Sequence, residues 1–312
     1  MKINVLLKSP WKFVDSPYYK NLVSYPPENV NFLINWSKVN TIVSPKLFVI
    51  RNTIKGVLRK TLEITKIPNL VFTSSGVDLI HCAHCLLLNK RSWVVDMEHY
   101  WNFSASSKIS YSSLGKSLIR RFLRREYCKK ILPWTHAAKN TLKEAIKDEE
   151  ILRKTEVVYP AISLFKLKKK KHDKISLLFI GRYFYQKGGL ITLEVFRRLK
   201  KRYDIDCTLI SLTIPNELKV KYQKFIRIFT SVSDEFLFEE IYPSSDIFIY
   251  PGFSDTFGFS LLEAMSFEIP IVTVDAFVRR EIVEDEKNGF VIERPHNVNV
   301  YRIGNKEGKN YK

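Results

Sequence analysis

The stretch DIFIYPGFSDTFGFSLLEAM, residues 246–265, decides the fold class of this chain. Its first part, residues 246–251, is a short β-rich apolar run that ends at a proline, which is typical of a buried strand. Residues 259–265 then contain good helix formers and no helix breaker. We therefore expect Asp255 in a loop that follows a strand, and Glu263 inside the next helix. This order of elements predicts an α/β fold.

The same stretch predicts a binding site. In open α/β sheets, ligands bind at the carboxyl ends of the strands, and the free backbone N–H groups at a helix start suit a phosphate. Asp255 would lie at the mouth of this crevice and Glu263 deeper inside it. Their carboxylates can then accept hydrogen bonds from two hydroxyl-bearing parts of one ligand. We expect a sugar phosphate or a nucleotide sugar. An ordinary amphipathic helix preceded by a loop aspartate would give the same local pattern.

A second strand, loop and helix pattern supplies cations. A β-rich run over residues 175–180 leads into Gly181 and Arg182, and Lys187 precedes a helical pattern that covers residues 190–201. Arginine offers a planar fork for phosphate oxygens, whereas lysine offers a mobile point charge. Lys187 alone would fit a solvated loop lysine, but the two cations together predict a pyrophosphate site.

These motifs resemble the signature of the retaining GT-B glycosyltransferases of the family-four type. The family's acidic block is written E-x7-E around F-G-x-x-x-L-E-A-M, and Asp255 and Glu263 give the form D-x7-E. Residues 181–188, GRYFYQKG, resemble its G-R-x4-K-G element, whose Arg and Lys bind the donor's phosphates. Residues 281–291 resemble its E-I-V and N-G-F elements. The resemblance is specific from about residue 155 to 293 and diffuse before it.

The resemblance implies roles at the donor's diphosphate. Arg182 and Lys187, beside Gly181, would stabilise the departing diphosphate, on which charge develops in the transition state. The backbone N–H groups around Phe257 and Gly258 would assist these cations or hold the sugar.

It also implies roles at the donor's sugars. Glu263 would hold the ribose hydroxyls, and Asp255 the hydroxyls of the transferred sugar. His99 follows a predicted strand over residues 92–96 and resembles the family histidine that faces the donor sugar, although a surface-loop histidine fits too. The residues expected to take part in catalysis are Arg182, Lys187, His99 and Asp255.

For the whole chain, the resemblance implies two Rossmann-like α/β domains that face each other across a cleft. Residues 1–165 would form the acceptor-binding domain and residues 175–312 the nucleotide-sugar-binding domain, which agrees with a length of 312 residues. Between them, residues 166–174, KLKKKKHDK, form a like-charged run that would stay solvated as a linker. The implied activity is that of a retaining, hexosyltransferase-type enzyme. It would move a sugar from a nucleotide-sugar donor to a glycan or lipid-linked acceptor.

Positive charge is concentrated in the first half of the chain. Residues 1–165 hold 26 of the 51 Lys and Arg residues but only 12 of the 32 Asp and Glu residues. Within them, residues 114–130 alternate cations and apolar side chains at roughly helical spacing. Such a helix suits an anionic membrane surface, or it packs its apolar side on the core. Charge alone also permits a basic nucleic-acid-binding protein, which we disfavour, and we expect no specific nucleic-acid partner.

Several positions depart from the family pattern. Glu268 stands where the family has glycine, and Phe277 and Val278 stand at a usual Gly-Gly. Because glycine alone adopts a positive φ cheaply, we expect these loops to differ in shape. Residues 299–312 are polar and lack the helical spacing of apolar residues expected of the family's closing helix. We therefore expect a truncated or a remodelled tail. These departures raise an alternative, a degenerate GT-B protein that binds nucleotide sugars without turnover.

Location and cofactors follow from what the sequence lacks. No apolar run approaches the ~20 residues that a membrane-spanning helix needs, and the start of the chain shows no signal segment. A cytoplasmic protein with peripheral binding at the inner face of the membrane is expected. The run HCAHC, residues 81–85, has zinc-ligand residue types, but ligands so close together cannot easily converge. We therefore expect no metal and no cofactor.

Overall fold

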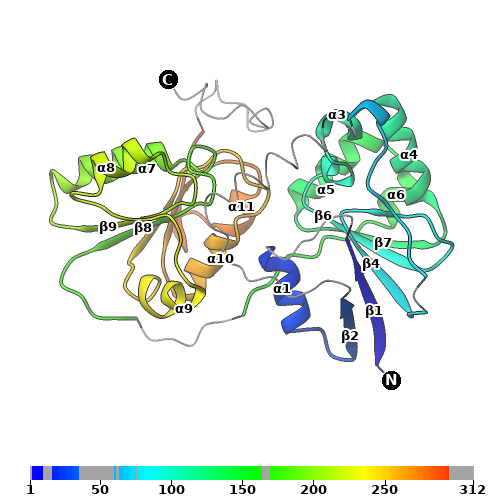
Figure 1. Cartoon of the computed structure of the whole chain (residues 1–312), viewed down its shortest axis with the longest axis horizontal. Helices are drawn as coiled ribbons and strands as arrows, with labels where there is room; N and C mark the ends of the chain where they lie inside the picture. The colour runs from blue at the N-terminus through cyan, green and yellow to red at the C-terminus, as the bar shows by residue number, and fades with distance from the viewer. Residues whose placement is uncertain are drawn as a thin grey trace. The chain divides into compact units, whose positions relative to one another are not determined.

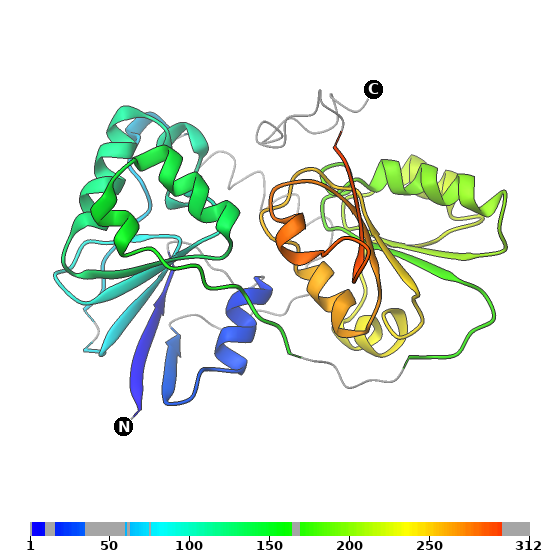
Figure 2. The same ribbon diagram turned by 180° about the vertical axis from the view of Figure 1, so that it is seen from behind.

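The computed structural model describes residues 2–9, 16–34, 60, 63–74, 76–163 and 169–294. The chain divides into two compact units, Met1–Ile162 (unit 1) and Ser163–Lys312 (unit 2), as Figures 1 and 2 show from opposite sides. Each unit is built around a parallel β-sheet. The α/β class predicted from the sequence is therefore confirmed. The predicted remodelling of residues 299–312 lies outside the described residues.

Unit 1 contains a five-stranded parallel sheet in the order β2-β1-β4-β6-β7. Its central strands are buried and mostly apolar, as expected where both faces of a parallel sheet are covered. A separate two-stranded parallel sheet pairs β3 with β5. The strands are β1 (Ile3–Lys8), β2 (Val30–Ile34), β3 (Leu70–Val71), β4 (Leu79–Ala83), β5 (Leu86–Leu87), β6 (Trp93–Met97) and β7 (Cys128–Pro133).

The helices of unit 1 include the basic amphipathic segment. Ile119, Phe122 and Leu123 of α4 are buried in the core of unit 1, so the apolar side of this helix packs inward. Part of its charge is paired within the unit, because Arg124 Nη2 lies 2.9 Å from Glu150 Oε2. The helices are α1 (Pro17–Ser24), the 3-10 helix η1 (Tyr100–Phe103), α3 (Ser107–Ser110), α4 (Ser113–Arg124), α5 (His136–Ile146) and α6 (Glu149–Arg153).

Unit 2 contains a six-stranded parallel sheet in the order β10-β9-β8-β11-β12-β13. Its strands are β8 (Ser176–Ile180), β9 (Asp206–Ile210), β10 (Arg227–Phe229), β11 (Ile247–Tyr250), β12 (Ile271–Val274) and β13 (Gly289–Ile292). Its helices are α7 (Gly189–Lys200), α8 (Asn216–Tyr222), α9 (Asp234–Phe236), a π-helical turn η2 (Leu237–Ile241), α10 (Phe259–Ser266) and α11 (Arg279–Ile282). The strand and helix predicted on either side of Asp255 are thus β11 and α10.

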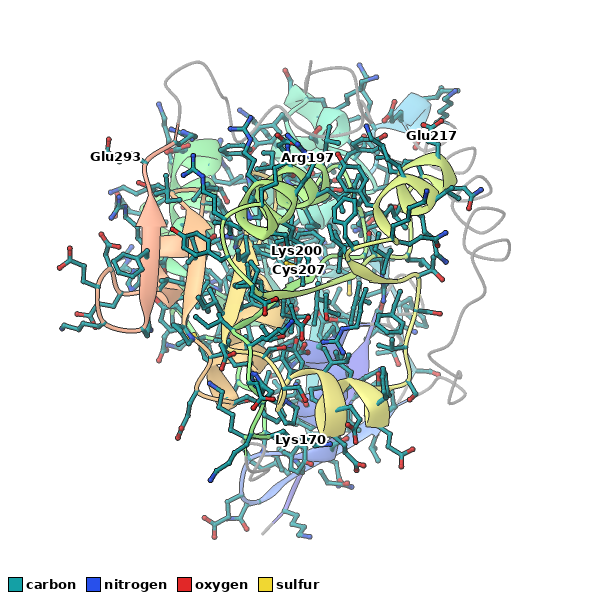
Figure 3. The ribbon with its side chains drawn as sticks, turned by 90° about the vertical axis from the view of Figure 1, so that its left-hand side faces the viewer. Lys170, Arg197, Lys200, Cys207, Glu217 and Glu293 are labelled. Carbon is teal, nitrogen blue, oxygen red and sulfur yellow. The ribbon has the colours of Figure 1, made fainter. Side chains whose placement is uncertain are left out.

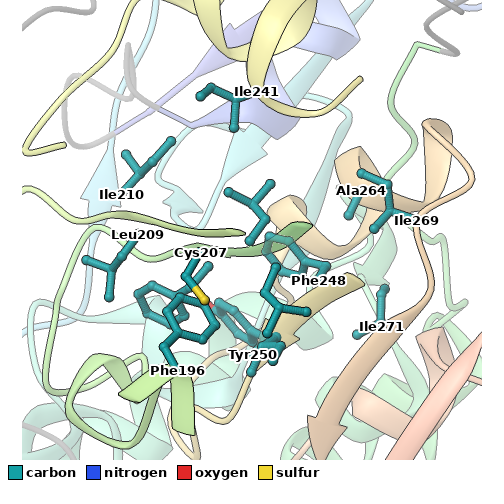
Figure 4. Packing of buried hydrophobic residues seen from close by; sticks show 14 of the residues in the cluster. Phe196, Cys207, Leu209, Ile210, Ile241, Phe248, Tyr250, Ala264, Ile269 and Ile271 are labelled. Atoms are coloured by element: carbon teal, nitrogen blue, oxygen red, sulfur yellow. The ribbon is translucent and has the colours of Figure 1, made fainter. Parts of the chain in front are cut away.

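The core of unit 2 joins its central strands to the helices that cover them. Figure 4 shows Phe196 of α7 and Cys207 of β9 in one cluster with Phe248 and Tyr250 of β11. On the other side of the sheet, Ala264 of α10 belongs to the same cluster.

The strand order creates a switch point in unit 2. From β8 the chain moves outward through β9 and β10, and it then returns to β11 on the opposite side of β8. The loops that follow β8 and β11 therefore leave the sheet side by side. In open α/β sheets such a point is where ligands bind.

The described part of the predicted linker lies against unit 2. Lys169 Nζ is 3.1 Å from Asp246 Oδ1, and Lys170 Nζ is 2.6 Å from Glu240 Oε2. Figure 3 shows Lys170 beside the α9–η2 turn, and Arg197 and Lys200 farther along the unit on α7. These lysines are paired with carboxylates of unit 2 and are not only solvated.

Two loops keep a left-handed backbone without glycine. Glu268, which follows α10, has φ 58°, and Phe277, which precedes α11, has φ 48°. Val278, next to Phe277, has φ −91°. The difference in loop shape from the family stays a prediction, because these angles describe only the backbone of single residues. The strain of a side chain at positive φ is of order 1–2 kcal/mol per residue, and the surrounding packing has to offset it.

Candidate active site

Glycines bring the two loops of the switch point into contact. Gly188 has φ 84°, and a Cβ atom there would lie 2.8 Å from the backbone carbon of Pro251. A Cβ atom on Gly252 would lie 2.8 Å from the backbone of Lys187. Gln186 adds a hydrogen bond from Nε2 to Ser254 Oγ at 3.2 Å. The loop after β8 and the loop after β11 therefore pack backbone to backbone, with no room for larger residues at these two positions.

Gly181 has a similar effect at the end of β8. Its N–H donates to the carbonyl oxygen of Ile210 at 3.0 Å, so it continues the pairing of β8 with β9. A Cβ atom there would lie 2.7 Å from Cβ of Lys187. The missing side chain therefore allows Lys187 to fold back over the strand end. Arg182, the next residue, has an exposed side chain, and its carbonyl oxygen accepts a hydrogen bond from Thr213 Oγ1 at 3.2 Å.

Lys187 and Asp255 meet in this space. Lys187 Nζ lies 2.8 Å from Asp255 Oδ1, and both side chains are largely buried, with 14% and 12% exposed. The other carboxylate oxygen, Oδ2, accepts a hydrogen bond from the Tyr250 hydroxyl at 2.6 Å. Two residues predicted to bind the donor are thus joined by a direct ion pair.

The charge state of Asp255 follows from these neighbours. Burial raises the pKa of this carboxyl, but the charges of Lys187 and Arg279 and the hydrogen bonds from Lys187 and Tyr250 outweigh it. The pKa of Asp255 is lowered to about 2. The carboxylate is therefore ionised at neutral pH, although it is surrounded by protein.

Arg279 completes the cluster, and sequence reasoning missed it. It is the first residue of α11 and is fully buried. Its Nη1 donates to the carbonyl oxygen of Phe257 at 3.0 Å, and its Nη2 lies 3.7 Å from Asp255 Oδ2. The guanidinium carbon lies 4.9 Å from the centre of the Tyr250 ring, within the range of a cation–π contact. The break in the family pattern at Phe277 and Val278 marked this segment of the sequence, but it did not distinguish Arg279 from its neighbour Arg280.

The start of α10 depends on a fourth glycine. Gly258 is the N-cap residue and has φ 97°, which glycine adopts without strain. The Phe257 side chain is buried and packs against the Phe259 ring, with ring centres 5.0 Å apart. Phe257 can therefore offer a ligand its backbone rather than its ring.

Glu263 belongs to a different network of unit 2. Its Oε2 accepts a hydrogen bond from the hydroxyl of Tyr242, which is fully buried, at 2.8 Å. Burial, and then the charge and hydrogen bond of Glu263, raise the pKa of Tyr242, so this tyrosine stays a hydrogen-bond donor. The structure does not bring Glu263 into the ion-paired cluster of Lys187, Asp255 and Arg279.

His99 lies in unit 1, just past the carboxyl end of β6. It caps η1, because its Nδ1 accepts a hydrogen bond from the N–H of Trp101 at 3.3 Å. Burial lowers its pKa from 6.5 to about 4. The imidazole is therefore neutral at pH 7. His99 is only 8% exposed, so the alternative of a surface-loop histidine is wrong.

Unit 1 also contains a buried polar network that the sequence did not predict. Asp96, at the end of β6, is fully buried and accepts hydrogen bonds from the hydroxyl of Tyr19 at 2.8 Å and from Trp134 Nε1 at 3.2 Å. His81 Nε2 lies 3.7 Å from the other oxygen of Asp96. Burial raises the pKa of Asp96, but interactions with His81, His84 and Tyr19 lower it below its ordinary value. This network joins α1 to the carboxyl ends of β4 and β6.

In the part of the chain that the structure describes, no group of three or more His, Cys, Asp and Glu residues is placed to hold a metal ion. Cys82 and Cys85, from the run of zinc-ligand residue types, are instead buried in the core of unit 1. Within the same described ranges, no helix is both long and apolar enough to cross a membrane.

The two parallel-sheet units define the class of protein. Solved structures that this chain resembles include sucrose-phosphate synthase from Thermosynechococcus elongatus, with a TM-score of 0.60 and 12% identity over 94% of this chain and 86% of that one. Anabaena HepE in complex with UDP-glucose gives a TM-score of 0.55 and 13% identity over 93% of this chain and 85% of that one. These likenesses confirm the GT-B-like fold class.

The sequence of unit 2 matches a known family. Residues 162–301 match the family described as glycosyl transferases group 1. An uncharacterized glycosyltransferase of Haemophilus influenzae is 25% identical over 269 residues, which are 82% of this chain and 72% of the relative. The predicted resemblance is confirmed, and unit 2 carries the domain of the group 1 glycosyltransferases. Fold and family together support glycosyltransferase activity.

Proposed function

We propose that this protein is a retaining glycosyltransferase that takes a sugar from a nucleotide-sugar donor and transfers it to a glycan or lipid-linked acceptor. The observation that carries the proposal is the contact between the loops after β8 and β11, where Lys187 and Asp255 meet at 2.8 Å. A cation, a carboxylate and a helix start at one switch point suit a ligand with both phosphate and hydroxyl groups.

The donor's diphosphate would bind to the loop after β8. Arg182 is exposed at the end of β8 and can form paired hydrogen bonds with phosphate oxygens. Lys187 would turn from Asp255 to the phosphate, because its flexible side chain is a mobile point charge. The backbone around Gly258 would add N–H groups at the start of α10. These groups would stabilise the charge that develops on the departing nucleoside diphosphate.

The donor's two sugars would bind to carboxylates. Glu263 lies on α10 and would hold the ribose hydroxyls, with Tyr242 fixing its orientation. Asp255 would accept hydrogen bonds from hydroxyls of the transferred sugar, since its low pKa keeps it ionised. His99 is neutral because burial lowers its pKa to about 4, so it would bind the transferred sugar as a hydrogen-bonding group without charge.

We place the acceptor on unit 1 and the protein in the cytoplasm, bound peripherally to the inner face of the membrane. Leu114 at the start of α4 is 49% exposed and Tyr111 just before it is 44% exposed. Lys116 lies over the Tyr111 ring, and Arg121 of the same helix is exposed. Apolar and basic side chains together favour an anionic lipid surface.

Membrane binding is tested by sedimentation with lipid vesicles. We expect the protein to pellet with vesicles that contain an anionic lipid and to be released by salt. Leu114→Glu should weaken this binding. Val220→Glu, at a residue of unit 2 that is 51% exposed, is the matched control. Equal pelleting with neutral vesicles, or no effect of Leu114→Glu, would contradict the membrane proposal.

The activity is tested by incubating the protein with UDP-, GDP- and ADP-sugars, with and without a lipid extract, and measuring released nucleoside diphosphate. Arg182→Ala should abolish release. Arg198→Ala, at a surface residue paired with Glu194, should leave release unchanged. NMR of the product's anomeric proton would then test retention. Binding of a donor without release over a broad acceptor panel would contradict catalysis and indicate a non-catalytic binding protein.

A further inference from the structure

Asp255 has two cationic neighbours, and the function proposed above would move one of them away when the donor binds. In the structure, Lys187 is the closer, at 2.8 Å from Oδ1, and Arg279 lies at 3.7 Å from Oδ2. The function proposed above sends Lys187 to the donor's diphosphate. That movement would remove the nearest positive charge from a carboxylate that is only 12% exposed. A buried charge that loses its partner is strongly destabilised.

Arg279 is placed to compensate for that loss. It cannot withdraw, because it is fully buried, bonded through Nη1 to the carbonyl oxygen of Phe257 and held over the Tyr250 ring. Among the described residues, its Nε and Nη2 atoms have no hydrogen-bond partner. A shift of less than about 1 Å would bring Nη2 within hydrogen-bond distance of Asp255. The guanidinium is therefore fixed in place with an unused donor 3.7 Å from the carboxylate.

We propose that Arg279 is a positioning residue that takes over the Asp255 carboxylate when Lys187 leaves it to bind the donor's diphosphate. This inference rests on the proposed function. In the bound state Arg279 holds Asp255 in its ionised form and anchors the loop through Phe257, so the carboxylate keeps its place beside the transferred sugar. Lys187 then binds phosphate without leaving an uncompensated charge behind.

Proton uptake on donor binding distinguishes this role of Arg279 from a purely structural one. The charged or titratable groups that face Asp255 are Lys187 from the loop after β8, Tyr250 from β11 and Arg279 from α11. If Arg279 is neutralised, Asp255 loses both cations on donor binding and has to take up a proton. If Arg279 only braces the loop, its removal weakens binding without any coupling to protons.

The test is calorimetric titration of the nucleotide sugar that the wild-type protein binds, repeated in buffers of different ionisation enthalpy. A nucleotide sugar is suitable because its diphosphate has no titrating group near neutral pH. We expect no proton uptake by Asp255 in the wild type. Arg279→Gln keeps an amide donor for the Phe257 carbonyl but removes the charge. For this variant we expect uptake of up to one proton per donor bound.

The same experiment has a second readout in its pH dependence. Because the variant takes up a proton on binding, its affinity should fall as pH rises. The ratio of the variant Kd to the wild-type Kd should therefore increase severalfold between pH 6 and pH 8.5, with about tenfold per pH unit as the upper limit for one proton. Arg279→Lys, which keeps the charge, should show no uptake. Arg280→Gln, at the neighbouring exposed residue paired with Asp275, is the matched control and should behave as wild type.

The outcomes separate this inference from the proposed function. If the wild type binds no nucleotide sugar, the proposed function fails. If the wild type binds and a folded Arg279→Gln variant binds with no proton uptake, the takeover by Arg279 is overturned. Should Arg279→Gln not fold, a crystal structure of the wild type with its donor decides. We expect Nη2 of Arg279 within hydrogen-bond distance of Asp255 and Lys187 on the phosphate, whereas an unchanged Lys187–Asp255 pair overturns the inference.

Discussion

The ammonium group of Lys187 lies 2.8 Å from the Asp255 carboxylate and joins the loop after β8 to the loop after β11. Sixty-eight positions separate these residues along the chain, and the strand order of the sheet brings them together. Both belong to motifs with a proposed role at the donor. In the ligand-free protein they stabilise each other, so donor binding has to exchange one ion pair for another.

The strength of this pair can be measured with a double-mutant cycle. Lys187→Met leaves a buried carboxylate with a more distant cation, and we expect it to lower the free energy of unfolding by about 3 kcal/mol. Asp255→Asn should also destabilise, and the double variant should lose less than the sum of the two single changes. Urea unfolding provides the values. Additive losses would show that the two side chains do not interact.

A control for this cycle is available on the surface of the same unit. Lys174 pairs with Asp204 at 2.7 Å, but both side chains are largely exposed. Exposed pairs contribute little, so Lys174→Met should leave the urea midpoint unchanged.

Stability in acid should depend on Asp255. Its pKa is lowered from 3.8 to about 2, so its contribution is fully present above the unfolded value and is lost as pH falls through the folded value. The shift corresponds to about 2 kcal/mol. We expect the wild type to lose this amount between about pH 4 and pH 2 relative to Asp255→Asn, as measured by urea unfolding. Parallel curves for the two proteins would contradict the lowered pKa.

His99 should act in a higher pH window. Burial lowers its pKa from 6.5 to about 4, so the folded state resists a proton that the unfolded chain accepts. The stability associated with neutral His99 is present above pH 6.5 and is lost as pH falls toward 4. Holding His99 in its buried position at acid pH costs about 3 kcal/mol of folding free energy. NMR titration of the imidazole should give the low pKa directly, and a value near 6.5 would contradict the buried position.

Glycine should be better than glutamate at residue 268. Glu268 is exposed and has φ 58°, a conformation that glycine adopts without strain. We expect Glu268→Gly to raise the free energy of unfolding by up to about 1 kcal/mol, since relief of strain exceeds the added freedom of the unfolded chain. Lys201→Gly, at an exposed residue with φ −75°, should destabilise instead. If both changes destabilise, the left-handed backbone at Glu268 is not strained.

Turnover should not require an added divalent metal. Arg182 and Lys187 lie on one loop and can neutralise the departing diphosphate without a metal ion. We expect nucleoside diphosphate release to persist after dialysis against a chelator. Activity that disappears in the chelator and returns with magnesium or manganese would contradict the roles given to these two cations.

Much of unit 2 could be predicted from the sequence because its signals are local. The apolar run at β11, the proline after it and the helix formers of α10 lie within twenty residues of one another. The spacing of Arg182 and Lys187 is also local. Strand, loop and helix follow from such patterns through burial and propensity alone. The parallel sheet then places the two loops together.

The partners of Asp255 could not be predicted in this way. Tyr250 looks like a core residue of a strand, and its hydroxyl bond to Asp255 depends on how the next loop turns back. Arg279 is one of two adjacent arginines, and nothing in the sequence distinguishes the buried one from its exposed neighbour Arg280. Their contacts exist only once β11, α10 and α11 are packed. The left-handed backbone at Phe277 was missed for the same reason, because tertiary packing overrides the local preference for glycine.

The central claim is that the loops after β8 and β11 of unit 2 form the donor site. The most direct test is calorimetric titration of the wild type, Lys187→Met and the surface control Lys174→Met with a panel of UDP-, GDP- and ADP-sugars. We predict that the wild type and Lys174→Met bind one nucleotide sugar with the same affinity and that Lys187→Met, while still folded, loses at least tenfold in affinity. Equal binding by all three proteins would contradict the claim and place the donor elsewhere on the molecule.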